Sequence, residues 1–296
     1  MVFLHILHNL AIVLKITVLR NKLQALLLWA FLCISNSNVY SQSLRYSLSM
    51  PYLSLGAYST KQVDPFSFTN NQAALAQVKT AGVGVYGERR FLLAENSVYG
   101  VALAMPTKMG NFGLQANYGG FSNFSENKIG LAYARSLGSK VDLGVQFNYY
   151  GYRIPGYNSA STVNFEIGTI IHLTDQLNAG IHVYNPVGGK LDKYTDEKLA
   201  SAYKFGLGYD VSDHFYASAE MVKEEDKSIN VIGGVQYQFA KQFFARAGFM
   251  SETGGGFAGA GVAWKNLRLD VSASYHPQLG FSPGLLLIVN FKGAAK

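Results

Sequence analysis

Apolar and polar residues alternate with a period of two along most of this chain. From Val141 the odd positions are apolar and the even positions are Asp, Gly, Gln and Asn, and the same alternation recurs from Val163 and from Leu267. Strict alternation of this kind indicates β-strands with two different faces. One face of each strand is apolar, and the other is polar or glycine.

Fourteen segments between residues 81 and 292 follow this pattern. The predicted strands span 81–89, 95–105, 109–119, 126–136, 140–152, 162–174, 176–185, 201–212, 214–225, 227–239, 242–251, 256–264, 267–276 and 283–292. Strands of soluble proteins have a mode of about 5–6 residues, whereas tilted strands that cross an outer membrane need about 9–11. Most of these segments have the longer length. They therefore predict an all-β fold, a transmembrane antiparallel β-barrel of about 14 strands.

The connections between the predicted strands differ in length. Short turns are expected at 137–139, 174–175 and 212–213, and longer Gly-, Pro- and Asn-rich loops at 153–161, 186–200 and 252–255. Bacterial outer-membrane barrels carry short turns on the periplasmic rim and longer loops on the other. The competing architecture is a soluble sandwich or a lipocalin-like cup, whose outer face would need more charge than these polar faces hold.

Aromatic residues gather near the ends of the predicted strands. In a membrane barrel they would form girdles at the two interfaces, and in a soluble fold they would pack a core. The residues concerned are Tyr149, Tyr150, Tyr152, Tyr184, Phe215, Tyr216, Tyr237, Phe243, Phe244 and Trp264.

The first 41 residues have the layout of a secretory signal peptide. Arg20 and Lys22 precede a largely apolar run at 23–34, and polar residues lead to a cleavage site before Gln42. A membrane anchor is the alternative, but this run is about half of the ~20 residues that a spanning helix needs. The single cysteine, Cys33, lies in this segment, so the mature chain is expected to contain no disulfide.

The charge of the chain is low and evenly spread. Charged residues make up 15% of the sequence, against about 25% in an average soluble domain. The net charge of +7 falls when the acid-free segment 1–41 is set aside, which leaves 22 cations against 18 acids. Nucleic-acid binding requires a clustered basic surface, and these charges are interspersed. We therefore expect no nucleic-acid partner.

Motifs of catalysis and metal binding are missing from the sequence. The G-x-G-x-x-G match at 82–87 lies within a predicted strand, not between a strand and a helix. His172 and His182 lie on adjacent predicted strands and could meet across a hairpin, but two ligands do not make a zinc site. We expect no catalytic residues, no metal, no cofactor and no enzyme activity.

Charged residues of both signs punctuate the polar faces. Mixed signs favour a lumen network that pairs charges and holds a plug, whereas a permeation route would need a ring of one sign. The predicted network comprises Glu88, Asp142, Glu166, Lys204, Glu220, Arg246, Arg268 and Asp270.

The segment 42–80 does not alternate well and contains the candidate hatch residues Asn70, Asn71, Gln72, Ala73, Ala74 and Leu75. The last five of these resemble the Asn-Pro-Ala motif that precedes the first strand in the FadL family of outer-membrane transporters. The same motif occurs in the PorV- and PorQ-like relatives of the type IX secretion system of Bacteroidota. This chain departs from it at Gln72, where the motif has proline. Further similarity lies at 130–135, 143–147, 168–171 and 179–188, the last ending in a turn with Asn185, Pro186 and Gly188.

The resemblance implies a fourteen-stranded barrel with an N-terminal plug. The expected division is a signal peptide at 1–41, a hatch at 42–80, the barrel at 81–292 and a tail at 293–296. The implied function is an outer-membrane barrel that passes or binds hydrophobic small molecules. The alternative is a non-transporting platform that docks exported proteins. We further expect export to the bacterial outer membrane, contact with its lipid and insertion by the barrel assembly machinery. The expected partners are a hydrophobic ligand or secreted proteins.

Overall fold

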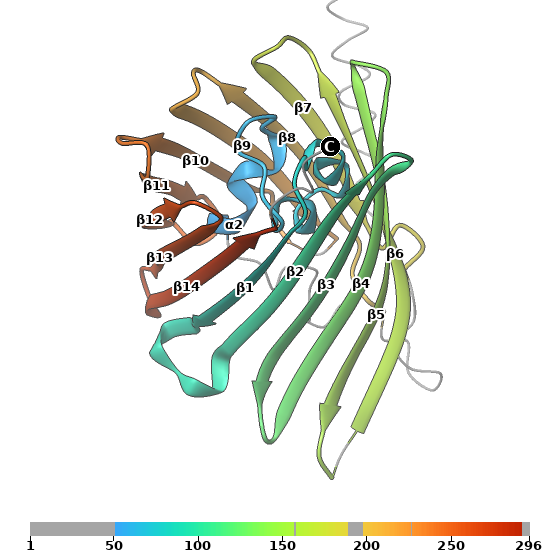
Figure 1. Ribbon diagram of the computed structural model, residues 1–296. Coiled ribbons are helices and arrows are strands. Elements are labelled where there is room, and N and C mark those ends of the chain that lie inside the picture. Colours follow the sequence, from blue (N-terminus) through green and yellow to red (C-terminus); the bar gives the residue numbers. More distant parts are fainter. Residues whose placement is uncertain (1–50, 157, 189–197, 226, 292–296) are drawn as a thin grey trace, which may run out of the picture. The chain divides into compact units, whose positions relative to one another are not determined.

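The computed structural model describes residues 51–156, 158–188, 198–225 and 227–291. The predicted signal peptide, the first part of the predicted hatch segment and the tail 293–296 lie outside these residues. The described residues form a closed antiparallel β-barrel of fourteen strands (Figure 1). The strands are β1 (Gly82–Arg89), β2 (Ser97–Thr107), β3 (Gly110–Phe121), β4 (Phe124–Leu137), β5 (Val141–Ile154), β6 (Asn158–His172), β7 (Leu177–Tyr184), β8 (Ala202–Asp210), β9 (Phe215–Glu224), β10 (Asn230–Gln238), β11 (Phe243–Met250), β12 (Gly255–Trp264), β13 (Leu267–His276) and β14 (Gly280–Asn290).

Each strand pairs with its neighbours in the sequence, and β1 closes the barrel against β14 from Gly82↔Asn290 to Glu88↔Gly284. The prediction of fourteen strands and an all-β fold is confirmed. The predicted loop at 153–161 is wrong. The β5–β6 ladder continues through Tyr152↔Ala160 to Ile154↔Asn158, because an antiparallel hairpin can extend its hydrogen bonds through Ser- and Thr-rich sequence.

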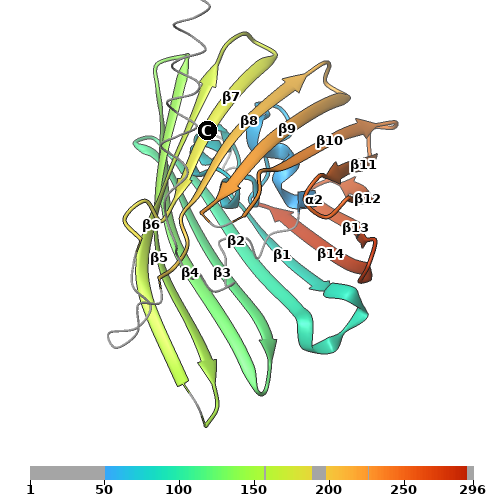
Figure 2. The same cartoon turned by 180° about the vertical axis from the view of Figure 1, so that it is seen from behind.

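The two rims of the barrel differ in their connections. One rim, here the short-turn rim, carries the turns at 108–109, 138–140, 173–176, 211–214, 239–242 and 265–266. The other, here the long-loop rim, includes the end of β7, the beginning of β8 and a connection with the 3₁₀ helices η4 (Arg90–Leu92) and η5 (Ala94–Asn96). At that rim the hairpins β3–β4 and β5–β6 project furthest (Figures 1 and 2). The predicted asymmetry is confirmed only in part, because the same rim also carries short turns at 122–123, 155–157 and 277–279, and the predicted loop at 252–255 is a four-residue connection, 251–254.

The outer face of the barrel is apolar. Leu131, Phe147 and Val163 are 59%, 63% and 67% exposed. On β6 and the residue that follows it, the outward positions from Val163 to Leu173 are apolar except Thr169. They cover about 34 Å of strand, or about 26 Å at a tilt of about 40°. This height matches the apolar band of about 25 Å that an outer-membrane barrel presents to lipid.

The aromatic residues near the strand ends divide between the two faces. Tyr149, Tyr237, Phe243 and Trp264 are exposed on the outer wall, as girdle residues would be. The girdle interpretation is wrong for the others that face inward, because adjacent strand residues point to opposite sides of a sheet. The buried inward-facing aromatics are Tyr150, Tyr184, Tyr216 and Phe244.

Residues 51–80 lie inside the barrel and are here called the hatch (Figure 1). They form α2 (Pro51–Ser54) and the 3₁₀ helices η1 (Leu55–Tyr58), η2 (Ser67–Thr69) and η3 (Gln72–Gln77). No helix within the described residues is long and apolar enough to cross a membrane. The largest buried apolar cluster lies between the hatch and the wall, and its hatch members are Leu53, Leu55, Phe66, Phe68, Leu75 and Val78. The barrel's core is therefore shared with its plug.

Candidate functional site: the hatch and its attachment to the wall

The predicted hatch motif forms the beginning of η3. Asn71 caps the helix, since its side-chain oxygen accepts a hydrogen bond from Ala73 N at 3.0 Å, and its Nδ2 donates to Ile181 O at 3.2 Å. Gln72 occupies the first helical position, where proline is favoured. Here its side chain donates to Glu166 Oε2 at 2.5 Å. All six motif residues are buried, and Asn70, Asn71 and Gln72 bind the wall through their side chains. Proline at position 72 could not supply the bond to Glu166.

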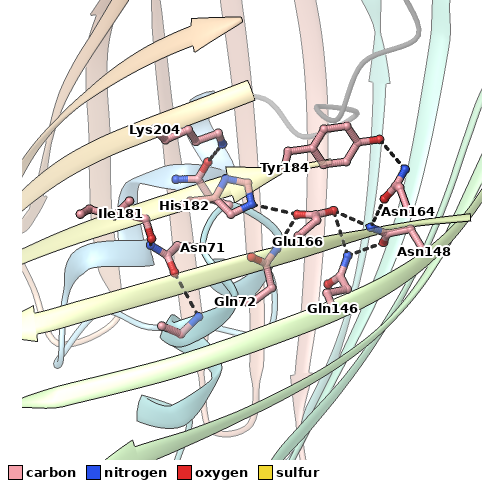
Figure 3. A network of polar contacts seen from close by, with 12 residues as sticks. Asn71, Gln72, Gln146, Asn148, Asn164, Glu166, Ile181, His182, Tyr184 and Lys204 are labelled. Atoms are coloured by element: carbon pink, nitrogen blue, oxygen red, sulfur yellow. Dashed lines mark hydrogen bonds and ion pairs between the residues drawn. The ribbon is translucent and has the colours of Figure 1, made fainter. Parts of the chain in front are cut away.

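Glu166, on β6, is the centre of the largest buried polar network (Figure 3). Lys128 Nζ lies 2.6 Å from its Oε1, and His182 Nε2 lies 3.0 Å from its Oε2. Asn148 Nδ2 and Gln146 Nε2 donate to Oε1 at 2.8 and 3.3 Å. A buried carboxylate is tolerated when it is paired and hydrogen-bonded. Glu166 therefore connects strands β4 to β7 with the hatch.

The same network reaches two further wall residues. Asn164 accepts a hydrogen bond from Asn148 at 2.8 Å and donates to the Tyr184 hydroxyl at 3.0 Å. The Lys128 ammonium lies 5.0 Å from the centre of the Tyr184 ring, within the range of a cation–π contact. Lys128 is thus held from two sides.

A second cluster gathers around Glu220 on β9. The Tyr58 hydroxyl and Asn70 Nδ2 donate to its Oε2 at 2.5 and 2.6 Å. Lys204 Nζ lies 3.8 Å from Oε1 and also donates to Asn70 Oδ1. Burial and the nearby carboxylate raise the pKa of Tyr58 well above its usual value. The hydroxyl therefore stays protonated and keeps its role as a donor.

A third cluster attaches the hatch to β13. Arg268 Nη1 lies 3.0 Å from Asp64 Oδ2, and Arg268 Nη2 lies 2.5 Å from Asp270 Oδ2. Arg246 Nη2 is 3.9 Å from the same Asp64 oxygen. The Arg268 guanidinium also lies 4.7 Å from the centre of the Phe244 ring. Two arginines of the wall thus compensate one carboxylate of the hatch and one of the wall.

Contacts at the short-turn rim complete the attachment. Ser59 Oγ donates to Asp210 Oδ1 at 2.5 Å, and Lys61 Nζ lies 2.6 Å from Asp213 Oδ1. This exposed hydrogen bond raises the pKa of Lys61 and lowers that of Asp213. A hollow of about 590 Å³ remains between the hatch and the wall near Arg268.

Glycines on the inner wall make room for the hatch. A Cβ at Gly206 would lie 2.1 Å from Tyr58 Cζ, and one at Gly180 would lie 2.6 Å from its Cε1. A Cβ at Gly144 would meet the Gln72 backbone at 2.3 Å, and one at Gly168 would meet Asn71 Oδ1 at 2.2 Å. Side chains at these positions would exclude the hatch from its present place.

The eight residues of the predicted lumen network all face inward, but they fall into separate clusters. Arg268, Arg246 and Asp270 share one cluster, and Lys204 and Glu220 share another. The remaining three stand in three different places: Glu166 in the network of Figure 3, Asp142 beside His172 at 2.8 Å, and Glu88 beside Arg90 at 3.7 Å.

Sequence reasoning missed several partners of these charges. Lys128 lies on the polar face of its strand, so alternation could have placed it in the lumen. The hatch residues Tyr58 and Asp64 carry no periodic signal. His172 and His182 do not meet across their hairpin, because the register pairs His172 with Asn178 and His182 with Gly168.

Two smaller expectations concern metals and a turn. Within the described parts of the chain, no three His, Cys, Asp or Glu side chains are grouped as metal ligands. Asn185 has a φ of 49° and Gly188 a φ of 62°, and Gly188 N donates to Asn185 O at 3.2 Å. A tight turn therefore follows β7.

Comparison with solved structures identifies barrels of the same fold. No family model and no curated protein matches the sequence. The toluene transporter TbuX of Ralstonia pickettii superposes with a TM-score of 0.56 at 11% identity, over 77% of this chain and 93% of that one. The Pseudomonas putida toluene transporter TodX gives 0.57 at 8%, over 79% and 96%. A Pseudomonas aeruginosa FadL homologue gives 0.53 at 11%, over 77% and 93%. The chain has the fold of these solved barrels.

Proposed function

We propose that this protein is an outer-membrane channel for hydrophobic small molecules and that the hatch is its gate. The observation that carries the proposal is a plug, residues 51–80, whose described contacts to the inner wall of the barrel are all noncovalent. The apolar outer band supports a place in the outer membrane. The likeness of fold to transporters of toluene supports a small, apolar substrate.

The attachment of the hatch suits a gate. Beside the shared apolar cluster, it is held by side-chain hydrogen bonds and ion pairs, such as Tyr58 to Glu220, Gln72 to Glu166 and Asp64 to Arg268. Each hydrogen bond of this kind contributes about 0.5–3 kcal/mol net. Contacts of this size can be broken and re-formed one after another without unfolding the barrel.

A reversible tether tests the proposal. The hatch variant carries Ser59→Cys with Asp210→Cys, and a short bifunctional thiol reagent joins the two cysteines through disulfides. The control carries Ser274→Cys with Ser282→Cys, a wall pair in direct register between β13 and β14. Both are made in a Cys33→Ser background. Uptake of radiolabelled toluene is measured in intact bacteria that lack other hydrocarbon channels.

Tethering should abolish protein-dependent uptake in the hatch variant, and reduction should restore it. The wall-tethered control should keep its uptake throughout. Equal uptake with the hatch tethered would show that the hatch is not the gate. No uptake by a folded, membrane-inserted protein in any form would refute the channel.

The platform alternative, with its type IX secretion partners, makes a different prediction. A PorV-like docking barrel would co-purify with large secreted proteins and retain no hydrophobic ligand. A channel should instead retain a fatty acid or detergent-like ligand and lose it on deletion of residues 42–80. Purification from the native envelope, followed by mass spectrometry of proteins and lipids, separates the two.

A further inference from the structure

A hydrogen-bonded chain of wall residues joins two parts of the hatch, the ends of η1 and η3, near the short-turn rim. Asn178 Nδ2 donates to Tyr58 O at 3.0 Å, and Asn178 Oδ1 lies 2.6 Å from His172 Nδ1. His172 Nε2 lies 2.8 Å from Asp142 Oδ2. Gln77 Nε2 donates to the same oxygen at 2.6 Å. This chain of hydrogen bonds, here called the relay, runs from η1 through the wall residues Asn178, His172 and Asp142 to the end of η3.

The orientation of Asn178 fixes the protons on His172. A backbone carbonyl only accepts, so the Asn178 amide nitrogen must face Tyr58 O and its oxygen must face His172 Nδ1. His172 Nδ1 therefore needs a proton to donate to the Asn178 oxygen. The other ring nitrogen lies 2.8 Å from the Asp142 carboxylate, which also accepts, and 3.4 Å from Gln77 Nε2. The shorter contact, between a ring nitrogen and a carboxylate oxygen, needs a proton between the two atoms. A neutral imidazole carries a proton on only one nitrogen. The His172–Asp142 pair therefore holds one proton more than a neutral imidazole beside a carboxylate.

The surroundings of His172 give this proton access to water. The relay borders a hollow of about 360 Å³, open at the short-turn rim, and the His172 side chain is 12% exposed. Three charged groups line the hollow: Asp142 on β5, Lys140 in the turn before it and Asp175 in the β6–β7 turn. The hatch contributes only uncharged side chains, Thr60 and Gln77, to the lining.

We propose that His172 is a protonation-dependent latch that holds the hatch at low pH and loosens it at high pH. The regulation of permeability that follows rests on the channel function proposed above. Loss of the proton places a nitrogen lone pair 2.6 Å from Asn178 Oδ1. Rotating the Asn178 amide relieves this contact but turns its oxygen toward the Tyr58 carbonyl. One hydrogen bond of the relay is lost in either case, and the bond lost on rotation is the one that joins the wall to the hatch, from Asn178 to Tyr58 O.

A buried cysteine reports how often the hatch leaves its place. Ala74 is fully buried in η3, and Ala74→Cys in a Cys33→Ser background supplies a single thiol. Labelling by a maleimide is measured in the folded, reconstituted protein between pH 6 and pH 8.5. Every rate is divided by that of Ser122→Cys, an exposed position in the β3–β4 turn, because thiol reactivity itself rises with pH. The normalised rate should rise about tenfold over this range, as expected for one lost hydrogen bond.

Two substitutions fix the latch in its two states. His172→Gln, which is never charged, should label at the high-pH rate at every pH. His172→Arg, which is always charged and can donate to both neighbours, should label slowly at every pH. The matched control is His214→Gln, at an exposed histidine of the β8–β9 turn, and it should keep the pH dependence of the parent protein.

The outcome is decisive in each arm. The same pH dependence in His172→Gln and His172→Arg as in the parent would overturn the latch. Heat-modifiable gel mobility confirms that each variant is folded. A pH-dependent hatch in a protein that transports no toluene would leave the latch standing and refute only the channel.

Discussion

The slot that receives Tyr58 gives the sharpest test of how the hatch is held. The Tyr58 ring lies against three glycines of the wall, and Gly206 leaves the least space. A Cβ added there would lie 2.1, 2.2 and 2.6 Å from Tyr58 Cζ, Cε2 and the hydroxyl oxygen. The ring cannot retreat without releasing Glu220, which its hydroxyl contacts at 2.5 Å. Gly206→Ala should therefore displace Tyr58.

The magnitude follows from two terms. Overpacking of a well-filled site costs about 1–3 kcal/mol, and the loss of a hydrogen bond to a charged partner costs about 1.5–3 kcal/mol. The hatch-in state should therefore lose about 2.5–6 kcal/mol. Labelling of the Ala74→Cys reporter should rise by a factor of about 60 or more. Gly87→Ala is the control, because its Cβ would face outward and meet only Tyr99, at 3.4 Å.

A double-mutant cycle separates the clash from a general effect on the barrel. In a Tyr58→Ala background the ring is gone, so Gly206→Ala should add little to the labelling rate. The reasoning fails if Gly206→Ala labels like Gly87→Ala. It fails equally if the cost of Gly206→Ala is the same with and without the Tyr58 ring.

Three other substitutions test different parts of the architecture. Glu166→Gln leaves the buried Lys128 charge uncompensated and should lower the free energy of unfolding by about 3–5 kcal/mol. The measurement is a guanidinium titration in which the folded fraction is read from heat-modifiable gel mobility. An unchanged midpoint would contradict the paired network. Leu131→Arg on the apolar band should destabilise insertion into lipid vesicles by about 2–4 kcal/mol. The control Asn127→Arg, at an outward-facing position nearer the long-loop rim, should be tolerated. Equal effects of the two substitutions would argue against a lipid-facing band. Asn71→Ala removes the cap of η3 and should cost about 1–2 kcal/mol, seen as about tenfold faster labelling of the hatch reporter, and no change in rate would show that the cap does not hold the hatch.

The wall of the barrel could be predicted from the sequence because its signal is local. Alternation placed Val163 outside and Glu166 inside, and both lie where the pattern predicts. Tyr150 shows how a second interpretation can mislead: its position in the alternation indicates the lumen, yet its aromatic character suggested the lipid interface. The position of Tyr150 in the alternation decides its direction here, because successive side chains of a strand point to opposite faces of the sheet whatever their type.

The contacts of the hatch could not be predicted in the same way. Tyr58 and Glu220 are separated by 162 positions, and no periodic pattern relates a 3₁₀ turn to a strand so distant in sequence. The glycines of the inner wall, such as Gly206 and Gly168, were the available signal. They mark where a wall residue gives up its side chain to another segment, although the sequence does not say which segment.

The ion pair between Asp64 and Arg268 has a consequence for how the chain matures. The two residues are 204 positions apart, so the hatch is made early and its partner on β13 arrives almost last. A chain truncated before β13 would have an Asp64 carboxylate without this arginine, at a site that is buried in the finished barrel. The hatch therefore gains all of its polar contacts only in a barrel whose last strands are present.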